Sequence, residues 1–437
     1  MGSSRIKKAS TLQEIPNAFR DEPLDGDDIL KFYKDTIETR TGENGVSPMR
    51  YIYRSCTNPG ERKAFLLMGH RGCGKSTELN HLAMQLNEND YPVRTIYCSQ
   101  ELDRLNMVYS DILILMAEAL VSLADELIIK ISNKDLTTLL NFRQEIEKED
   151  IVTKDADLAA EGGLSLESPK ILSGLLGFFF SVKSSLKYNR ESRITIREKV
   201  EKRISEWIAA INSLADQITA KKDGKQPILI FEDLDKGNTW DVFHSHCEQL
   251  TATTFPTIFT FPVGLSYSPE FSEMDGFFTA KRLPMIKTQK ITGDSNPEGI
   301  AIIHSIIESR ADSCLFGKNV IDHLIAMTGG SLRDLFNAIL EAAFISMERD
   351  QSSISMDAAQ IALRELRSSL KIRIDASDYP FLRSVYEDHL SITDKPELLR
   401  MMQAGVVLEY NGDLWYNLHP MIADYLISIG ELNRERK

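Results

Sequence analysis

The chain has 437 residues, of which 42% are hydrophobic and 26% are charged, and its formal net charge is −13. This length is enough for two to four domains with cores of their own, and the acidic balance argues against a broadly basic nucleic-acid binder. The five cysteines are scattered without a CxxC pair, which fits a reduced cytosol and no zinc site. The longest apolar stretch, residues 171–182, is too short for a transmembrane helix, so we expect a cytoplasmic protein without membrane contact.

The polar N-terminal part predicts an extension with one helix, over residues 27–42. An apolar run at 63–69 then predicts a buried parallel strand, and the residues after it are rich in glycine. Their spacing, Gly-x-x-x-x-Gly-Lys-Ser, is that of the P-loop, whose backbone N–H groups cradle phosphates while the lysine reaches the β- and γ-phosphates and the serine holds Mg²⁺. The residues expected to bind ATP or ADP here are Gly69, Gly72, Cys73, Gly74, Lys75, Ser76 and Thr77.

The residues that follow predict alternating helices and strands. Residues 76–86 predict a helix whose N-terminus faces the phosphates, and residues 91–99 predict a second strand. A largely apolar stretch at 106–131 predicts a long buried helix. Residues 133–163 turn acidic and polar, which indicates a flexible, solvated connection. Because Cys73 lies inside the phosphate loop, we also expect alkylating reagents to block nucleotide binding.

Residues 164–188 carry a different pattern. Apolar and polar residues alternate from Phe179 to Tyr188, which predicts a strand, and with the GGLSL segment before it we expect a β-hairpin insertion. Its apolar face either packs on the protein's own core or forms a surface for a neighbouring subunit or partner. Residues 193–220 then predict one amphipathic helix, because isoleucine, valine and leucine recur at steps of three and four.

An apolar strand at residues 227–231 ends in two adjacent carboxylates, Glu232 and Asp233. Opposite a P-loop lysine, one carboxylate of such a pair belongs to the Mg²⁺ shell, and the other orients or deprotonates the attacking water. We expect Asp233 to be essential for hydrolysis. The division of the two roles between the carboxylates stays open.

Two further strands are predicted, at residues 255–265 and 281–290. In parallel sheets of this type, ligands lie at the carboxyl ends of the strands. Thr260 falls late in the first of these strands. It is therefore either a sensor of the γ-phosphate or a buried threonine whose hydrogen bonds are satisfied within the core.

The order of these motifs resembles that of a known family. The P-loop, the strand ending in paired acids and the later segment TGGSLRDLFNAILEAA are similar to those of AAA+ and STAND ATPases, above all the branch near the origin-recognition initiators. The resemblance covers roughly residues 60–430. It implies a GG-x-x-R segment, here Gly329, Gly330 and Arg333, that opens a lid helix whose arginine touches the γ-phosphate of its own subunit. The family's acidic pair begins with Asp, whereas this pair begins with Glu232.

The resemblance also implies the fold class and the domain order. We expect an α/β fold with the parallel sheet of a P-loop NTPase, followed by a helical lid and a winged-helix domain. The expected boundaries are 1–60 for the N-terminal extension, 61–290 for the ATPase domain with an insertion at about 133–192, 291–370 for the lid and 371–437 for the winged helix.

The winged helix is predicted by helices followed by two apolar runs, 406–410 and 414–418, which Asn-Gly-Asp joins as in a hairpin. From Lys371 to Lys437 there are eight Lys or Arg against eleven Asp or Glu, and the hairpin tip carries Asp413. Because phosphate contacts rely on cationic side chains, DNA is a possible partner that we do not favour. The resemblance to STAND proteins implies an internal brace or a partner-binding unit instead.

Together these inferences predict an ATP-binding and ATP-hydrolysing switch that forms homo-oligomers and controls a separately encoded effector or sensor. Similar stand-alone ATPases occur in prokaryotic conflict systems, which makes antiphage defence our interpretation of its role. An arginine from a neighbouring subunit often completes such sites, and Arg310 and Arg282 are the candidates by position.

Two alternatives stay open. One is a scaffold that holds nucleotide with little hydrolysis. The other is a DNA-associated loader or transposition-type regulator, in which ATP controls binding to duplex DNA. The basic residues that such a protein would present to DNA are Arg193, Lys199, Lys202 and Arg203.

Overall fold

The structure is a computed structural model. It describes residues 5–41, 45–58, 63–103, 105–131, 133–149, 169–236, 239–390, 395–410 and 415–433. Among these residues, no helix has the length and apolar character that crossing a membrane requires.

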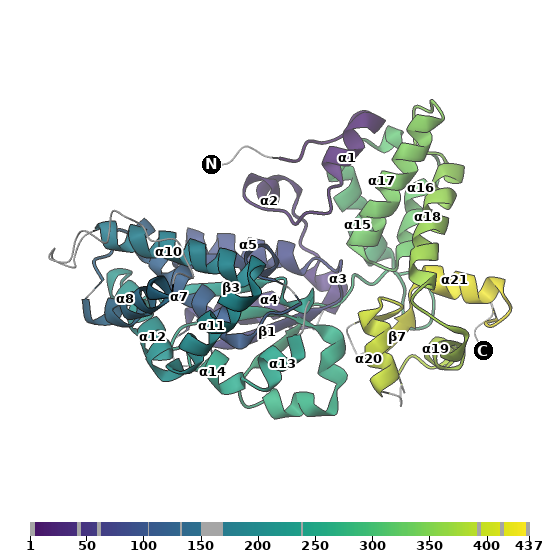
Figure 1. Cartoon of the computed structure of the whole chain (residues 1–437). Coiled ribbons are helices and arrows are strands. Elements are labelled where there is room, and N and C mark those ends of the chain that lie inside the picture. Colours follow the sequence, from purple (N-terminus) through teal and green to yellow (C-terminus); the bar gives the residue numbers. More distant parts are fainter. Residues whose placement is uncertain are drawn as a thin grey trace.

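The centre of the chain is a five-stranded sheet in which all paired neighbours are parallel, with the order β2-β3-β4-β1-β5 (Figure 1). Its strands are β1 (Ala64–Gly69), β2 (Val93–Tyr97), β3 (Ile228–Glu232), β4 (Thr257–Pro262) and β5 (Thr279–Arg282). Every residue of β1 and β3 is buried, as expected for parallel strands covered on both faces. The α/β fold class and the strands near residues 63–69, 91–99, 227–231 and 255–265 are thus confirmed.

The fifth strand differs from its prediction. β5 ends at Arg282, so most of the range 281–290 lies outside the sheet. Pro284 has no N–H to donate to a neighbouring strand, which is the physical reason why the pairing stops there.

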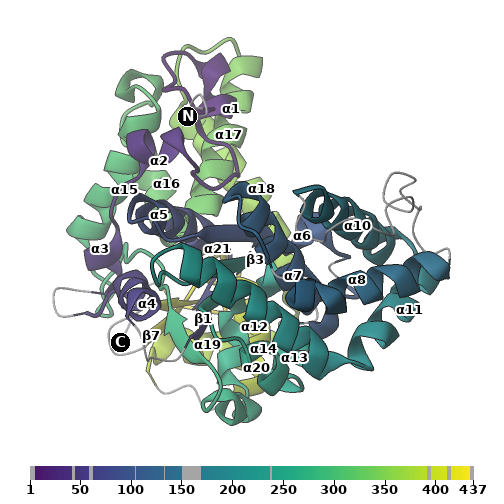
Figure 2. The same ribbon diagram turned by 90° about the vertical axis from the view of Figure 1, so that its left-hand side faces the viewer.

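Helices cover the sheet on both faces (Figures 1 and 2). They include α4 (Pro48–Thr57), α5 (Lys75–Glu88), α6 (Cys98–Glu101), α7 (Tyr109–Glu126), α12 (Ile204–Lys221), α13 (Thr239–His244) and α14 (Cys247–Thr251). The short 3-10 segments beside them are η2 (Leu234–Lys236), η3 (Val263–Tyr267) and η4 (Pro269–Met274). The predicted buried helix at 106–131 corresponds to α7, in which both ends are shorter than expected.

A helical lobe stands at the edge of the sheet away from the lid (Figure 2), and here two predictions are wrong. Residues 133–163 were expected to be solvated coil, yet α8 occupies Asn133–Lys148 and buries Leu139, Phe142 and Ile146. Those three apolar residues recur at helical steps, and they outweigh the acidic residues between them. Residues 150–168 lie outside the described part of the chain.

The expected β-hairpin at 164–188 is also wrong. Its described part is one helix, α10 (Pro169–Tyr188). The buried positions include Leu172, Leu175, Phe179, Val182 and Leu186. These steps of three and four residues are the period of a helix face, and the period of two between Phe179 and Tyr188 was a shorter coincidence within it.

The single helix predicted at 193–220 is two helices, α11 (Arg190–Glu201) and α12, separated at Lys202 and Arg203. Arg203 has φ −131° and ψ 36°, which is outside the helical region. The predicted apolar face is nevertheless correct, because Ile196, Val200 and Ile211 are fully buried.

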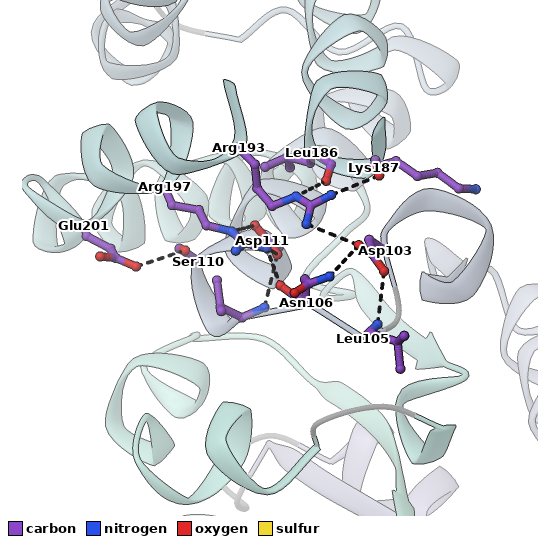
Figure 3. Close-up of polar contacts among 11 residues, drawn as sticks. Asp103, Leu105, Asn106, Ser110, Asp111, Leu186, Lys187, Arg193, Arg197 and Glu201 are labelled. Carbon is purple, nitrogen blue, oxygen red and sulfur yellow. Dashed lines mark hydrogen bonds and ion pairs between the residues drawn. The ribbon is translucent and has the colours of Figure 1, made fainter. Parts of the chain in front are cut away.

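Two arginines of α11 fasten the lobe to the sheet unit (Figure 3). Arg197 donates to both oxygens of the buried Asp111 of α7, at 2.9 and 2.6 Å. Arg193 donates to the carbonyl oxygen of Leu186 at 2.6 Å and pairs with Asp103 at 3.2 Å. The forked guanidinium suits both tasks, since it presents several donors in one plane.

A bundle of four helices forms the lid. It contains α15 (Pro297–Arg310), α16 (Val320–Thr328), α17 (Leu332–Glu348) and α18 (Met356–Lys371), with η5 (Ser313–Leu315) between the first two. N-terminal residues pack against it, and α1 lies beside α17 (Figure 1). The N-terminal elements are η1 (Leu12–Glu14), α1 (Ile15–Ala18), α2 (Asp27–Phe32) and α3 (Ile37–Thr41), so the one helix predicted at 27–42 is two.

The C-terminal unit is the predicted winged helix. It contains η6 (Ala376–Asp378), α19 (Tyr379–Glu387), α20 (Lys395–Gln403), the antiparallel hairpin β6 (Val407–Tyr410) and β7 (Trp415–Leu418), and α21 (Pro420–Ser428). The hairpin tip, with Asp413, lies outside the described residues. Both hairpin strands are entirely buried, which indicates that they pack against the rest of the molecule.

Candidate nucleotide-binding site

The phosphate loop joins β1 to α5 at the carboxyl edge of the sheet. Two of its glycines have left-handed backbone angles, with φ 81° at Gly72 and 101° at Gly74, which glycine adopts without steric cost. A Cβ atom on Gly72 would also lie 2.7 Å from Cβ of Arg333 in the lid. The glycine therefore permits both the turn of the loop and the close approach of the lid.

Lys75 begins α5 and is buried. Its ammonium nitrogen donates to the carbonyl oxygens of Gly69 at 2.8 Å and His70 at 3.1 Å, and it lies 2.9 Å from Oδ2 of Asp235. Burial is the largest single effect and lowers the pKa of Lys75, but the combined effects of Asp235, Cys73 and Glu232 exceed it, so the pKa is raised. The lysine is therefore charged, and a phosphate group would have to compete with Asp235 for it.

Asp235 is a site residue that the sequence analysis did not assign. It is buried beside Lys75 and lines the same cavity. The only signal in the sequence was a third acid in the run Glu-Asp-Leu-Asp. A run of acids after a strand does not show which side chain turns toward the loop, because that depends on the short η2 segment.

Glu232, the last residue of β3, faces the start of α5. The hydroxyl of Ser76 donates to its Oε2 at 3.2 Å, while its Oε1 is buried without a hydrogen-bond partner among the described residues. Burial, followed by the charge of Asp235, raises the pKa of Glu232 to about 7. A serine hydroxyl beside a carboxylate oxygen with free acceptor capacity fits the oxygen ligands that Mg²⁺ prefers.

These groups do not form a metal cage by themselves, since no set of three metal-binding side chains gathers anywhere in the described residues.

Asp233 follows directly and has φ 65°, a left-handed angle that is uncommon for residues other than glycine. The hydroxyl of Ser99, in α6, donates to its Oδ2. Asp233 lines the cavity beside the phosphate loop. The two acids therefore have different neighbours, Ser99 for Asp233 and Ser76 for Glu232.

Two residues that were predicted to contact the nucleotide, Thr260 and Cys73, do not line the cavity. Thr260 is fully buried, its hydroxyl accepts from the N–H of Leu234 at 3.1 Å and lies 3.4 Å from the carbonyl oxygen of Phe231, and it does not line the cavity. The structure thus favours the satisfied core threonine over the phosphate sensor. Cys73 is also fully buried, with its side chain in a hydrophobic core, so the expected attack by alkylating reagents is wrong for this arrangement.

Arg333 approaches the loop from the lid. The N–H of Leu332 donates to the carbonyl oxygen of Gly72 at 3.1 Å, which places the first turn of α17 on the phosphate loop. Arg333 lines the cavity, and its Nε lies 2.9 Å from Oδ1 of Asp21. The predicted sensor arginine therefore lies at the cavity that Lys75 and Asp233 line, and it is paired with an acid of the N-terminal segment.

The cavity continues from the phosphate loop to an apolar end that the sequence analysis missed. The N-terminal segment and the lid supply its walls there, with Leu24, Phe32, Tyr33, Ile306, Arg310 and Phe336. The segment is held against α5, because the N–H of Leu24 donates to Thr77 Oγ1 at 3.2 Å and Asn80 donates to the carbonyl oxygen of Leu24 at 3.0 Å. Residues 20–36, expected to belong to a separate extension, thus form part of the site.

The buried Arg40 also belongs to this wall. It donates through Nη2 to the carbonyl oxygen of Cys73 at 2.7 Å and through Nη1 to that of Pro284. The N-terminal segment therefore supports the phosphate loop from behind. No local sequence pattern predicts this role, because an isolated arginine is most often exposed.

Arg310 and Arg282, which were expected to act on a neighbouring subunit, both form contacts within their own chain. Arg310 is buried and lines the cavity of its own chain. Arg282 donates to Ser266 Oγ at 2.9 Å, and its guanidinium lies 5.1 Å from the ring centroid of Tyr267. The burial of Arg310 disfavours it as an arginine finger, and the assignment of Arg282 stays a prediction.

The winged helix contacts the phosphate loop and the lid. The N–H of Glu409, in β6, donates to Nε2 of His70 at 2.8 Å, and the hydroxyl of Tyr410 donates to the carbonyl oxygen of Gly329 at 2.7 Å. Burial, with further effects of the charges of Lys75 and His419, lowers the pKa of His70 to about 3, so this imidazole is neutral.

The second helix of the winged helix, α20, packs on η3 of the sheet unit. In helix-turn-helix proteins this is the helix that enters the major groove. The basic residues of α11 and its C-terminal end are likewise engaged: Arg193 with Asp103, Lys199 with Glu149, Lys202 with Glu198 and Arg203 with Glu145. Each of these four basic residues therefore has an acidic neighbour in this arrangement.

Comparison with known proteins gives a likeness of fold. No family model and no curated protein matches the sequence. Among solved structures, the chain is similar to the Aeropyrum pernix ORC2 protein in ADPNP and ADP complexes, at 12% identity and TM-score 0.39, covering 87% of this chain and 91% of that one. It is similar to A. pernix ORC1 in complex with DNA at 11% identity and TM-score 0.38, covering 87% and 93%.

Drosophila ORC bound to DNA gives 11% identity and TM-score 0.38, covering 98% of this chain and 95% of that one. At such identities and scores the likeness concerns the arrangement of elements alone, and the chemistry of the site rests on the contacts described above.

Proposed function

We propose that this protein is a P-loop ATPase of the AAA+ and STAND type, which binds ATP or ADP with Mg²⁺ and hydrolyses ATP. One observation carries the proposal. Lys75, the Ser76–Glu232 pair and Asp233 meet at one end of a cavity whose other end is apolar. A charged triphosphate and a flat nucleobase need this combination of ends.

The residues have distinct proposed roles. Lys75 binds the phosphates once they displace Asp235, and the loop glycines let backbone N–H groups approach them. Glu232 and Ser76 hold the metal, which neutralises negative charge on the phosphate oxygens when it is bound. Asp233 orients the attacking water, and Ser99 positions its carboxylate. Glu232 thereby takes the place that Asp has in the resembled family.

Arg333 is proposed to bind the γ-phosphate in exchange for Asp21. Because the cavity walls belong to the sheet unit, the N-terminal segment and the lid, a triphosphate would favour one orientation of these parts over others. The winged helix is bonded to the same loop through His70, so we propose that it braces the arrangement described here. Homo-oligomers, a separately encoded effector and antiphage defence stay predictions.

The test measures ATP binding by calorimetry and phosphate release for the wild type and Asp233→Asn. We expect binding to persist and release to fall at least about a hundredfold, as when one catalytic group is removed. Asp216→Asn, on the exposed side of α12, is the matched control. Equal, slow release from all three proteins would support the scaffold alternative instead, and absence of ATP binding by the wild type would overturn the proposal.

A DNA-associated loader is the second candidate function. The observation that favours it is the winged helix itself, a unit that other proteins place in the major groove. Since α20 packs on η3, DNA binding would require release of the winged helix. A mobility-shift assay with plain duplex, with and without ATP and at several salt concentrations, tests this candidate: steeply salt-dependent binding only with ATP supports it.

A further inference from the structure

Arg310, the last residue of α15, is a buried cation in the wall of the same cavity. The side chain is only 3% exposed. Its Nη1 donates to the carbonyl oxygen of Ala18 at 2.7 Å, and its guanidinium carbon lies 4.6 Å from the ring centroid of Phe336. These contacts hold the guanidinium in one orientation at the cavity wall.

Its hydrogen-bonding capacity is largely unused. A guanidinium has five N–H donors. Among the described residues, the guanidinium of Arg310 donates one hydrogen bond, to the carbonyl oxygen of Ala18. Nε is buried without a hydrogen-bond partner among the described residues. Burial lowers the pKa of Arg310 to about 10, although the charge of Asp28 acts against that effect. An unpaired buried cation is costly, and it persists where a ligand completes its hydrogen bonds.

The surroundings indicate what that ligand is. Leu24, Phe32 and Phe336 line the same cavity as Arg310 and the phosphate loop. A nucleobase has apolar faces that suit such walls, and purine rings carry acceptor nitrogens on their edges. A phosphate group is not expected here, because the phosphates belong beside Lys75.

We propose that Arg310 is the residue that reads the nucleobase, by donating a hydrogen bond from its guanidinium to an acceptor nitrogen on the edge of a purine. The inference rests on the proposed function, since it concerns the same nucleotide. Ala18 and Phe336 position the donor, and binding of the purine satisfies a group that the protein's own described residues leave unsatisfied.

The first experiment compares metal-free ATP with inorganic tripolyphosphate, which lacks the base and the sugar. Arg310→Met retains the length and apolar character of the side chain and removes the donors. We expect ATP to bind about tenfold to hundredfold more weakly to this variant and tripolyphosphate to bind as it does to the wild type. Arg364→Met, an exposed arginine of α18, is the matched control and should leave both ligands unchanged.

The main part of the second experiment uses the wild type, so it does not depend on whether a variant folds. The wild type is titrated with 1-deaza-, 3-deaza- and 7-deaza-ATP, each of which lacks one acceptor nitrogen. We expect one analogue to bind about tenfold more weakly than ATP, and Arg310→Met to show no further loss for that analogue. The analogue identifies the nitrogen that Arg310 contacts.

Three outcomes would overturn the inference. They are equal losses of ATP and tripolyphosphate in Arg310→Met, unchanged binding of ATP to that variant, or equal binding of all three analogues to the wild type. These outcomes differ from failure of the proposed function, in which the wild type would bind neither ATP nor tripolyphosphate. If Arg310→Met does not fold, the analogues on the wild type decide alone.

Discussion

The two ends of the nucleotide cavity are built in different ways. At the phosphate end, a loop and one strand end supply Lys75, Ser76, Glu232 and Asp233. At the base end, residues from the N-terminal segment meet residues near 306–336 in the lid. The first end is a local motif on one sheet, and the second exists only when distant parts of the chain pack together. Changes at the phosphate end should therefore affect every phosphate ligand, whereas changes at the base end should affect nucleotides alone.

The largest expected effect is that of Lys75→Ala. Removing the ammonium deprives the phosphates of a buried charge, so phosphate release should fall about 10²- to 10³-fold. The affinities for ATP and for tripolyphosphate should fall by equal factors, because both ligands place their phosphates beside Lys75. Lys221→Ala, an exposed lysine at the end of α12, is the control for lost charge. Release at the wild-type rate from Lys75→Ala would contradict the assignment.

Asp235→Asn should act in opposite directions on stability and on binding. Lys75 and Asp235 are both buried, and removing one partner of a buried pair costs about 3 kcal/mol, so the ligand-free protein should unfold at lower denaturant concentration. Metal-free ATP should bind about tenfold more tightly, since no carboxylate then competes for the ammonium. Urea unfolding and calorimetry measure the two effects.

A decrease in ATP affinity for Asp235→Asn would show that Asp235 assists the bound nucleotide, and the competition described here would be wrong. Asp216→Asn serves again as the control, because it removes a carboxylate from the same unit without touching the cavity.

The same contrast explains which features the sequence predicted. The phosphate loop, the acids at the end of β3 and the lid arginine were all predicted as site residues, and they line one cavity. Each belongs to a short motif that can be recognised without knowledge of distant contacts. Asp235 was not assigned, since the turn of η2 decides its direction. Arg40 and Arg310 were not expected at the cavity, because their roles depend on packing between residues separated by more than two hundred positions.

The errors in the fold have a related cause. Leu139, Phe142 and Ile146 make α8 a buried helix, but acidic residues between them dominated the composition of the window. In α10 the apparent period of two covered only the last part of a longer helical pattern. Local composition and short periods mislead when tertiary packing decides which residues become the core.

A third prediction concerns the winged helix, which meets the phosphate end through His70. The pKa of His70 is about 3 in the folded protein against 6.5 for an ordinary histidine. Between these values the unfolded chain binds a proton that the folded protein does not, so the free energy of unfolding should fall as the pH falls below 6.5. The steepest contribution is about 1.4 kcal/mol per pH unit.

Replacing His70 by Gln keeps an acceptor for the N–H of Glu409 and removes the titration. Urea unfolding of His70→Gln between pH 6.5 and 4.5 should therefore show a shallower loss of stability than that of the wild type. His304→Gln, on α15 beside Asp322, is the control. Parallel pH profiles for His70→Gln and the wild type would show that His70 is not buried in the neutral form.

The smallest expected effect belongs to the base end and tests the contrast most directly. Phe336 lines that end, with its ring edge-on to Phe19 at 5.3 Å between centroids. Phe336→Leu keeps an apolar side chain and removes the ring, whose specific contacts contribute about 0.5–1.5 kcal/mol. ATP should therefore bind about threefold to tenfold more weakly, while tripolyphosphate should bind unchanged.

Calorimetry with both ligands on Phe336→Leu gives the ratio of the two losses. Phe344→Leu, an exposed phenylalanine of the same helix, is the matched control for loss of a ring. A ratio near one would mean that the base end transmits its effect to the phosphate loop through α17, whose first turn is bonded to Gly72. In that case the lid and the loop would act as one unit, and the division of the cavity into a local and an assembled end would not hold.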